Sequence, residues 1–234
     1  MIAKFLNTSF KINLLLFICG FSIYFIYFYP VLLHPNSVLS SIYADALKNY
    51  YTFMFHIKND ESFFHFNDLN FPFGEHIVYT DCQPLLSFLL RCLPFTHDYL
   101  IGILHLFIFL SFIITPLILN SILLRQNIDK LSSFFISLAV VLLSPQYSRL
   151  LAGHYALTYM FIIPLYIVLL LNVIENKTLR NISLLSLFNT ALFFLHPYFG
   201  FGCCVFSFLT LMMFEFFSFS HVKKFRNIAQ SLSA

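Results

Sequence analysis

Acidic side chains of this sequence are concentrated in one stretch, residues 43–84, where they could act together. Six of the ten Asp and Glu residues lie there, together with three of the nine histidines. Carboxylates and imidazoles can transfer protons near neutral pH or bind a divalent metal. Because a polar segment of this length exceeds an ordinary connection between helices, it indicates a functional site more than a plain connector.

Asp45 is the first candidate in this stretch, within the string ADALKNYY. A carboxylate close to a membrane surface could accept a proton from an incoming nucleophile, or hold a divalent metal against a phosphate leaving group. An acidic residue in the first turn of a helix would also be stabilised by the helix dipole without any chemical role. The spacing alone does not decide between these two interpretations.

The string NFPFGEHIVYTDCQP, residues 70–84, is the densest polar cluster and contains Glu75, His76 and Asp81. Carboxylates and a histidine could bind a hard or borderline metal. The alternative is a turn fixed by glycine and proline and packed beneath aromatic side chains. Since the spacing matches no metal motif, the residues alone favour the structural interpretation.

Two later segments carry further candidates, SRLLAGHYAL with Arg149 and His154, and LHPYFG with His196. Arg149 and His154 could together hold a phosphate, the arginine through its planar fork and the histidine as a donor. Arg149 could instead extend toward lipid headgroups at the end of a span. A lone histidine such as His196, at a membrane boundary, is more often a packing residue than a ligand.

Composition places these candidates in an integral membrane protein. The 234 residues are 59% hydrophobic and 10% charged, whereas soluble domains are about 25% charged. A net charge of +3 is too small to suggest a nucleic-acid partner. Four of the five cysteines fall in apolar runs, so neither a disulfide framework nor a paired-cysteine metal site is indicated.

Hydropathy predicts an all-α fold, a polytopic transmembrane helical bundle of about six spans. A span needs about 20 predominantly apolar residues. Residues 34–98 form a long loop with an amphipathic surface helix at 40–57 and a surface or re-entrant helix at 84–95. The predicted spans are 10–33, 99–124, 131–146, 155–174, 181–196 and 199–218.

The distribution of basic residues predicts the orientation of the chain. With both termini in the cytoplasm, nine Lys and Arg residues fall inside and four outside, as cytoplasmic loops require. The loop 34–98 is then exoplasmic and acidic, and the protein is a multi-pass protein of the cell (cytoplasmic) membrane. Residues 144–154 and 196–198 would converge on the same outer face.

With these motifs, the whole chain resembles the GT-C class of polytopic membrane glycosyltransferases, which includes protein O-mannosyltransferases and oligosaccharyltransferases. Within that class it is similar to bacterial membrane proteins that carry strings like NFPFGEHIVYTDCQP and SPQYSRLLAGHYAL. Members of the class usually have about twice as many spans. Residues 1–234 are therefore expected to be a single transmembrane domain and the N-terminal part of a larger GT-C-like module.

This resemblance implies that a sugar is transferred from a polyprenyl-phosphate donor to an acceptor glycan, lipid or protein on the exoplasmic face. Asp45 would be the catalytic residue, as a base or metal ligand. Asp81 would be a second ligand if a divalent cation such as Mg²⁺ or Mn²⁺ is bound. The substrate-binding residues would be Lys48, Asn49, Glu75, His76, Asp81, Arg149, His154 and His196.

Two other classes of function compete with this one. A transporter or flippase of lipid-linked or small anionic substrates would concentrate ionisable groups near the bilayer midplane, whereas here they cluster at one face. A non-catalytic membrane assembly subunit would tolerate the loss of every carboxylate in the loop 34–98.

Overall fold

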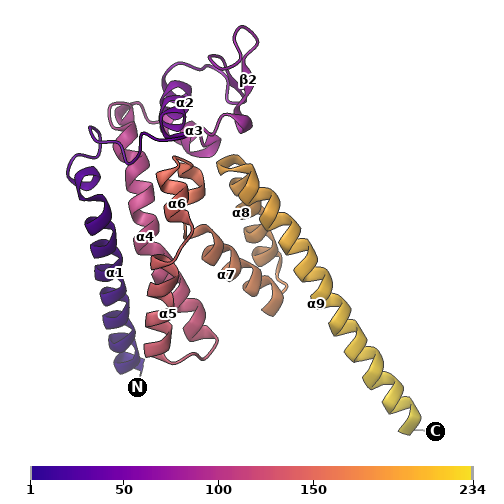
Figure 1. Cartoon of the computed structure of the whole chain (residues 1–234). Helices are drawn as coiled ribbons and strands as arrows, with labels where there is room; N and C mark the ends of the chain where they lie inside the picture. Colours follow the sequence, from indigo (N-terminus) through magenta and orange to yellow (C-terminus); the bar gives the residue numbers. More distant parts are fainter. Residues whose placement is uncertain (1, 233–234) are drawn as a thin grey trace. The chain divides into compact units, whose positions relative to one another are not determined.

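The computed structural model describes residues 2–232, with side chains from Phe10 to Phe217, and confirms the predicted all-α class (Figure 1). Within the described residues, the strands β1 His65–Phe66 and β2 Glu75–His76 pair as a two-stranded antiparallel hairpin. Short 3₁₀ helices are η1 Ile77–Tyr79, η2 Pro94–Thr96 and η3 Tyr155–Thr158. The α-helices are α1 Ile2–Leu33, α2 Ala46–Lys58, α3 Pro84–Arg91, α4 Leu100–Arg125, α5 Lys130–Leu142, α6 Gln146–Leu151, α7 Ile162–Glu175, α8 Leu179–Leu195 and α9 Pro197–Leu232.

The chain folds into two compact units. The first contains the residues up to Leu165 together with Phe194–His196, and the second contains Tyr166–Phe193 and the chain from Pro197 onward. All the contacts of the site described below lie within the first unit. The interpretation of the whole chain as one transmembrane domain stays a prediction.

Four helical segments in the described part of the chain are long and apolar enough to cross a membrane. They are Phe10–Leu33, Leu100–Arg125, Lys130–Leu151 and Pro197–Phe217, and they correspond to the first, second, third and sixth predicted spans. In the predicted span 155–174 the α-helix begins only at Ile162, because residues 155–158 form η3.

The remaining two predicted spans are short. The helix α7 has 14 residues and α8 has 17, which at about 1.5 Å per residue gives roughly 21 and 26 Å. The hydrocarbon core of a bilayer is about 30 Å thick. The structure thus supports a membrane protein with four helices of spanning length, and a bundle of six spans stays a prediction.

In the first unit, α1, α4 and α5 pack side by side (Figure 1). The helices α1 and α4 approach closely at Gly20, where a Cβ atom would lie 2.7 Å from the carbonyl oxygen of Phe112. Within the apolar layer, Asn120 Nδ2 donates to Asn13 Oδ1 at 3.1 Å, and Ser133 Oγ donates to Asn120 Oδ1 at 2.6 Å. These bonds link the three helices through groups that lipid could not satisfy.

The loop 34–98 is fixed to one end of these helices. Asn36 Oδ1 accepts a hydrogen bond from Gly102 N at 2.7 Å, at the start of α4 where the helix offers that N–H no partner. His105 in α4 contacts the Pro35 carbonyl oxygen at 2.8 Å and the Tyr50 hydroxyl of α2. The loop is therefore a folded cap on the helix ends.

The helix α2 begins six residues later than the predicted amphipathic helix 40–57. Its predicted apolar stripe is nevertheless present, since Ala46, Tyr50, Phe53 and Ile57 are all buried. These side chains are covered by protein rather than lying on a membrane surface, because α2 packs on α3 and α4. Ile42 lies within the predicted helix 40–57, but it precedes α2 and is 60% exposed.

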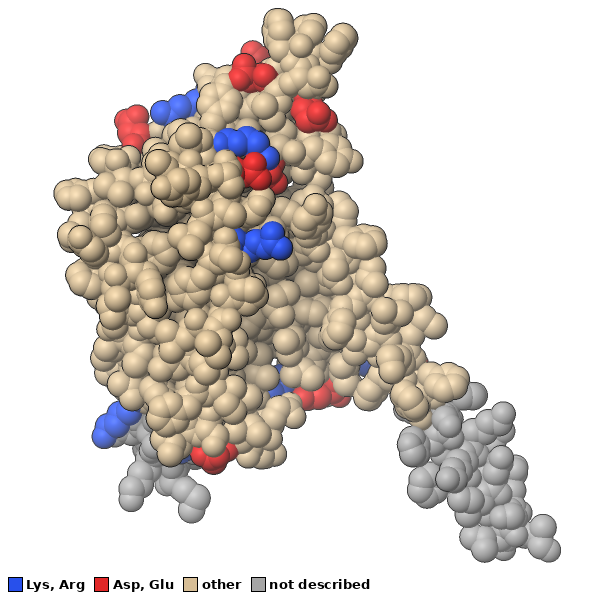
Figure 2. Space-filling view, in the orientation of Figure 1, with Lys and Arg blue, Asp and Glu red and all other residues tan. Residues whose placement is uncertain are grey.

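Charged side chains on the visible face lie mainly toward the two ends of the first unit, with a band of uncharged residues between them (Figure 2). This is the pattern expected of helices that cross a hydrocarbon layer. The end with the loop 34–98 is the one that carries the candidate site.

Candidate functional site

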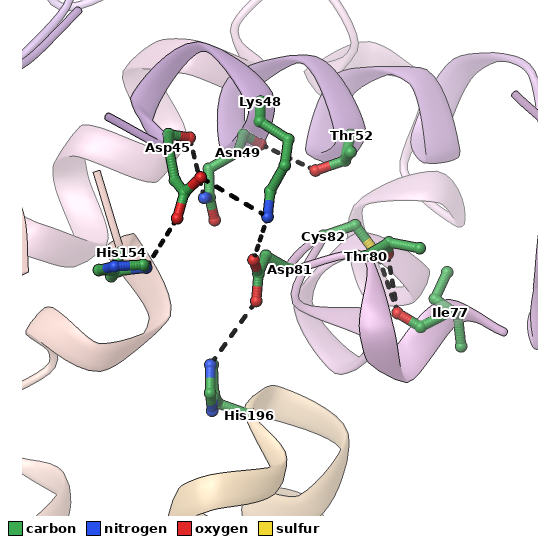
Figure 3. Close-up of polar contacts among 10 residues, drawn as sticks. All are labelled: Asp45, Lys48, Asn49, Thr52, Ile77, Thr80, Asp81, Cys82, His154 and His196. Atoms are coloured by element: carbon green, nitrogen blue, oxygen red, sulfur yellow. Dashed lines mark hydrogen bonds and ion pairs between the residues drawn. The ribbon is translucent and has the colours of Figure 1, made fainter. Parts of the chain in front are cut away.

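Five ionisable side chains from four segments of the chain meet at the loop end of the first unit (Figure 3). Lys48 Nζ donates a hydrogen bond to Asp81 Oδ2 at 2.7 Å and lies 3.9 Å from Asp45 Oδ1. His154 Nδ1 is 3.7 Å from Asp45 Oδ2, and His196 Nε2 is 3.7 Å from Asp81 Oδ1. We call these residues the five-residue cluster.

Asp45 occupies the N-cap position of α2, but its carboxylate makes no capping hydrogen bond. Its backbone is fixed instead, because its N–H donates to the Ala152 carbonyl oxygen at 3.2 Å and its own carbonyl accepts from Asn49 Nδ2 at 3.0 Å. Asn49 is thus a buried neighbour that holds the start of the helix. The Asp45 carboxylate, 44% exposed, is left to Lys48, His154 and solvent.

Gly153 brings His154 to Asp45. Its φ of +81° suits glycine, and a Cβ atom there would lie 2.2 Å from Ala46 Cα. The Ser41 hydroxyl donates to the Leu151 carbonyl oxygen at 2.6 Å, which fastens the same two segments together. The turn after α6 therefore lies directly against the start of α2.

Asp81 is aimed by its backbone. Asp81 and Gln83 have φ values of +60° and +54°, so the chain turns sharply before α3. Gln83 Oε1 accepts a hydrogen bond from the Tyr159 hydroxyl at 2.7 Å, and burial raises the pKa of Cys82 to about 12. With its neighbours buried, Asp81 is the residue of this turn that reaches Lys48.

The charges of the cluster influence one another. Partial burial lowers the pKa of Lys48, but the hydrogen bond to Asp81 and the charges of Asp81 and Asp45 outweigh it, so the pKa is raised. Burial lowers the pKa of His196, although Asp81 acts in the opposite direction and His154 in the same one. Lys48 is therefore a cation at neutral pH and His196 favours its neutral form.

Three predicted site residues lie apart from the five-residue cluster. Glu75 and His76 form β2, where His76 pairs with His65 in the hairpin register and its Nδ1 accepts from Val78 N at 3.3 Å. Arg149 is exposed on α6, and within the described side chains it makes no hydrogen bond or ion pair with the cluster. The structure brings together Asp45, Lys48, Asp81, His154 and His196, with Asn49 beside them.

The arrangement does not fit the predicted divalent cation at Asp45 and Asp81. The ammonium group of Lys48 lies between the two carboxylates. Among the described residues, no three or more His, Cys, Asp and Glu side chains are close enough together to hold a metal ion. Mg²⁺ and Mn²⁺ favour several oxygen ligands around one point, and here a basic side chain occupies the space between the acids.

A second polar group was not anticipated from the sequence. His56 Nδ1 lies 2.8 Å from Asp60 Oδ2, with both side chains fully buried. Asp60 Oδ1 accepts hydrogen bonds from the backbone N–H and side-chain amide of Asn67, at 3.1 and 3.0 Å. The spacing of His and Asp four residues apart at a helix end was the available signal. These contacts join the end of α2 to the residue that follows β1 and so hold the segment between them in place.

The fold and site thus define an all-α membrane protein with an ionisable cluster on one end of its helices. The chain belongs to the family of the domain of unknown function DUF6311, whose model matches residues 17–230 and so includes the whole cluster. No curated protein and no solved structure matches the chain.

Proposed function

We propose that the protein is a GT-C-like membrane glycosyltransferase that transfers a sugar from a polyprenyl-phosphate donor to an acceptor on the exoplasmic face. The observation that carries this proposal is the position of Asp45. Its partly exposed carboxylate lies beside an imidazole and an ammonium group at the end of the spanning helices. There it can meet both a lipid-anchored donor and a water-borne acceptor.

In the proposed reaction, the oxygen of the acceptor hydroxyl attacks the anomeric carbon of the sugar. Asp45 accepts the proton that this hydroxyl loses. The bond from that carbon to the phosphate oxygen breaks, and polyprenyl phosphate leaves with the electron pair. The product has the inverted configuration. Lys48 places a positive charge 3.9 Å from the Asp45 carboxylate.

The departing phosphate needs cationic or hydrogen-bonding groups close to the bilayer. Arg149 on α6 is exposed, a few residues before His154, and we assign it to the phosphate end of the donor. His154 lines the site beside Asp45, and His196 lines it beside Asp81, each at 3.7 Å. Glu75 and His76 are kept as candidates for acceptor binding only.

A transporter is less well supported by the contacts. Transport sites near the midplane need ionisable groups that can meet a substrate there. His105 is the ionisable residue within α4 before its C-terminal turn. Its ring nitrogens instead contact the Pro35 carbonyl oxygen and the Tyr50 hydroxyl. A scaffold or assembly subunit remains the outcome if the cluster can be removed without effect.

The proposal includes a place in the cell. The chain is a multi-pass protein of the cytoplasmic membrane, with both termini in the cytoplasm and the loop 34–98 outside.

Substitution of Asp45 by asparagine tests the role of the carboxylate. Purified chain in detergent is titrated with undecaprenyl-phosphate glucose, and transfer is measured in membranes that express the same protein. Asp45→Asn should retain binding within about twofold but reduce transfer by at least about 100-fold, the usual contribution of a positioned base. Arg149→Ala should weaken binding roughly tenfold through loss of a charged hydrogen bond.

Asp98→Asn is the matched control, because Asp98 is an exposed acid in the same loop that makes no contact with the cluster. It should leave both binding and transfer unchanged. Normal transfer by Asp45→Asn would refute the catalytic assignment. Failure of the folded wild-type chain to bind the donor would refute the proposed substrate class.

A further inference from the structure

Lys48 lies where two acidic side chains would otherwise face each other. Its Nζ atom is 2.7 Å from Asp81 and 3.9 Å from Asp45. Two carboxylates that share a site repel each other, so that one becomes protonated or a cation is bound between them. Here the chain supplies the cation itself.

The three residues are held in this arrangement by their own elements. Lys48 and Asp45 are three residues apart at the start of α2, so they lie on the same face of the helix. That end of α2 is fixed by Gly153 against Ala46. Asp81 reaches the pair from a turn with left-handed backbone on a separate segment. Lys48 is thus the bridge between two segments of the loop 34–98.

We propose that the ammonium group of Lys48 takes the place of a divalent metal ion between Asp45 and Asp81, so that the site works without a metal. An ammonium group has three N–H donors. One is bonded to Asp81 and a second is directed to Asp45 by the ion pair, and the third serves a substrate oxygen. The side chain is 42% exposed, so a ligand can reach it.

This inference extends the proposed function, since it replaces the expected metal at the same carboxylates. It does not depend on which group is transferred, because it concerns the charge balance of the cluster alone. Its test therefore measures metal binding and thermal stability, and its failure would leave the glycosyltransferase proposal standing.

Mn²⁺ is the probe, since its free concentration can be followed by electron paramagnetic resonance. The purified full chain should bind no Mn²⁺ at the cluster, and its melting temperature should be the same in Mn²⁺ and in EDTA. Lys48→Ala leaves Asp45 and Asp81 uncompensated, with His154 and His196 beside them. It should bind Mn²⁺ at least roughly tenfold more tightly than the weakest binding that the measurement detects, and Asp81→Asn in the same chain should abolish this binding.

Lys58→Ala is the matched control, because Lys58 is an exposed lysine at the other end of the same helix. It should behave as wild type. The proposal is overturned if wild type binds Mn²⁺ in a manner that Asp45→Asn or Asp81→Asn removes. A Lys48→Ala chain that melts as wild type and gains no affinity for Mn²⁺ would overturn it too. If Lys48→Ala does not fold, the wild type and Asp81→Asn still decide. The melting temperature of each is measured in Mn²⁺ and in EDTA, and a difference in the wild type that Asp81→Asn removes would overturn the proposal.

Discussion

Lys48 lies unequally between its two carboxylate neighbours, with the hydrogen bond going to Asp81 and a longer ion pair to Asp45. This difference assigns different roles to two residues that the sequence grouped together. Asp81 holds the lysine, and the Asp45 carboxylate stays available to solvent and to His154. A general base must not be fully engaged by other groups, and Asp45 meets this condition better because Lys48 donates its hydrogen bond to Asp81.

The buried His56 and Asp60 pair makes stability depend on pH. Burial lowers the pKa of His56 despite the opposing effect of Asp60. In the unfolded chain this histidine takes up a proton at the ordinary value of about pH 6.5, whereas in the folded chain it takes up the proton only at a lower pH. Stability is therefore lost as pH falls below that value. The melting temperature should drop between about pH 7.5 and pH 5.5, and the drop should be smaller in His56→Gln.

His76→Gln is the control for this effect, since His76 is exposed and should leave the full drop unchanged. His196, whose pKa is also lowered mainly by burial, contributes with the same sign in all three chains. A melting temperature that rises on acidification, and does so only when His56 is present, would show instead that His56 is protonated beside Asp60.

At the scale of elements, the contact between the turn after α6 and the start of α2 determines whether the cluster forms. Gly153 has a positive φ, and a Cβ atom there would lie 2.2 Å from both Ala46 Cα and Ala46 N. Because the clash is with backbone, no side chain can rotate away from it. The turn that carries His154 would have to move away from Asp45.

Gly153→Ala should therefore lower the free energy of unfolding by at least about 1–3 kcal/mol, the usual cost of a strained backbone position. Thermal unfolding in detergent, followed by circular dichroism, would measure this. Gly202→Ala is the matched control, because a Cβ atom at that helical position would meet nothing within 4 Å. It should be neutral or stabilising by up to about 1 kcal/mol. Equal melting of the two variants would contradict the proposed contact.

At the scale of the whole molecule, the lengths of the helices determine how many times the chain can cross a membrane. Four segments have spanning length, while α7 and α8 are shorter. Four and six crossings both put the two termini on the same side. The connection between α7 and α8 distinguishes them, since it reaches the cytoplasm only if both helices cross.

Single cysteines should report this topology in a chain whose exposed Cys92 and Cys204 are replaced by serine. A membrane-impermeant maleimide should label Glu61→Cys in intact cells and Gln126→Cys only after permeabilisation, as the distribution of basic residues predicts. Asn176→Cys should behave as Gln126→Cys if α7 and α8 both cross. Labelling of Asn176→Cys from outside would show that the chain crosses four times. Labelling of Gln126→Cys from outside would show that the orientation is the reverse of the predicted one.

The sequence by itself determined the class of protein and the helices of spanning length. Hydrophobicity is local, so a run such as 10–33 or 99–124 indicates an apolar helix without knowledge of its neighbours. The apolar stripe on α2 was also visible for this reason, because helical periodicity depends only on residues a few positions apart. The weaker predictions were 155–174 and 181–196, where a 3₁₀ turn and the length of each helix depend on packing.

Only the tertiary structure decided which candidates meet. Glu75 and His76 lie close to Asp81 in the sequence, yet the hairpin holds them in β2 while the turn after η1 aims Asp81 at Lys48. His154 and His196 reach the same point from far along the chain. Such contacts are set by glycine turns, left-handed backbone and docking of separate segments, and the spacing of polar residues along the chain does not encode them.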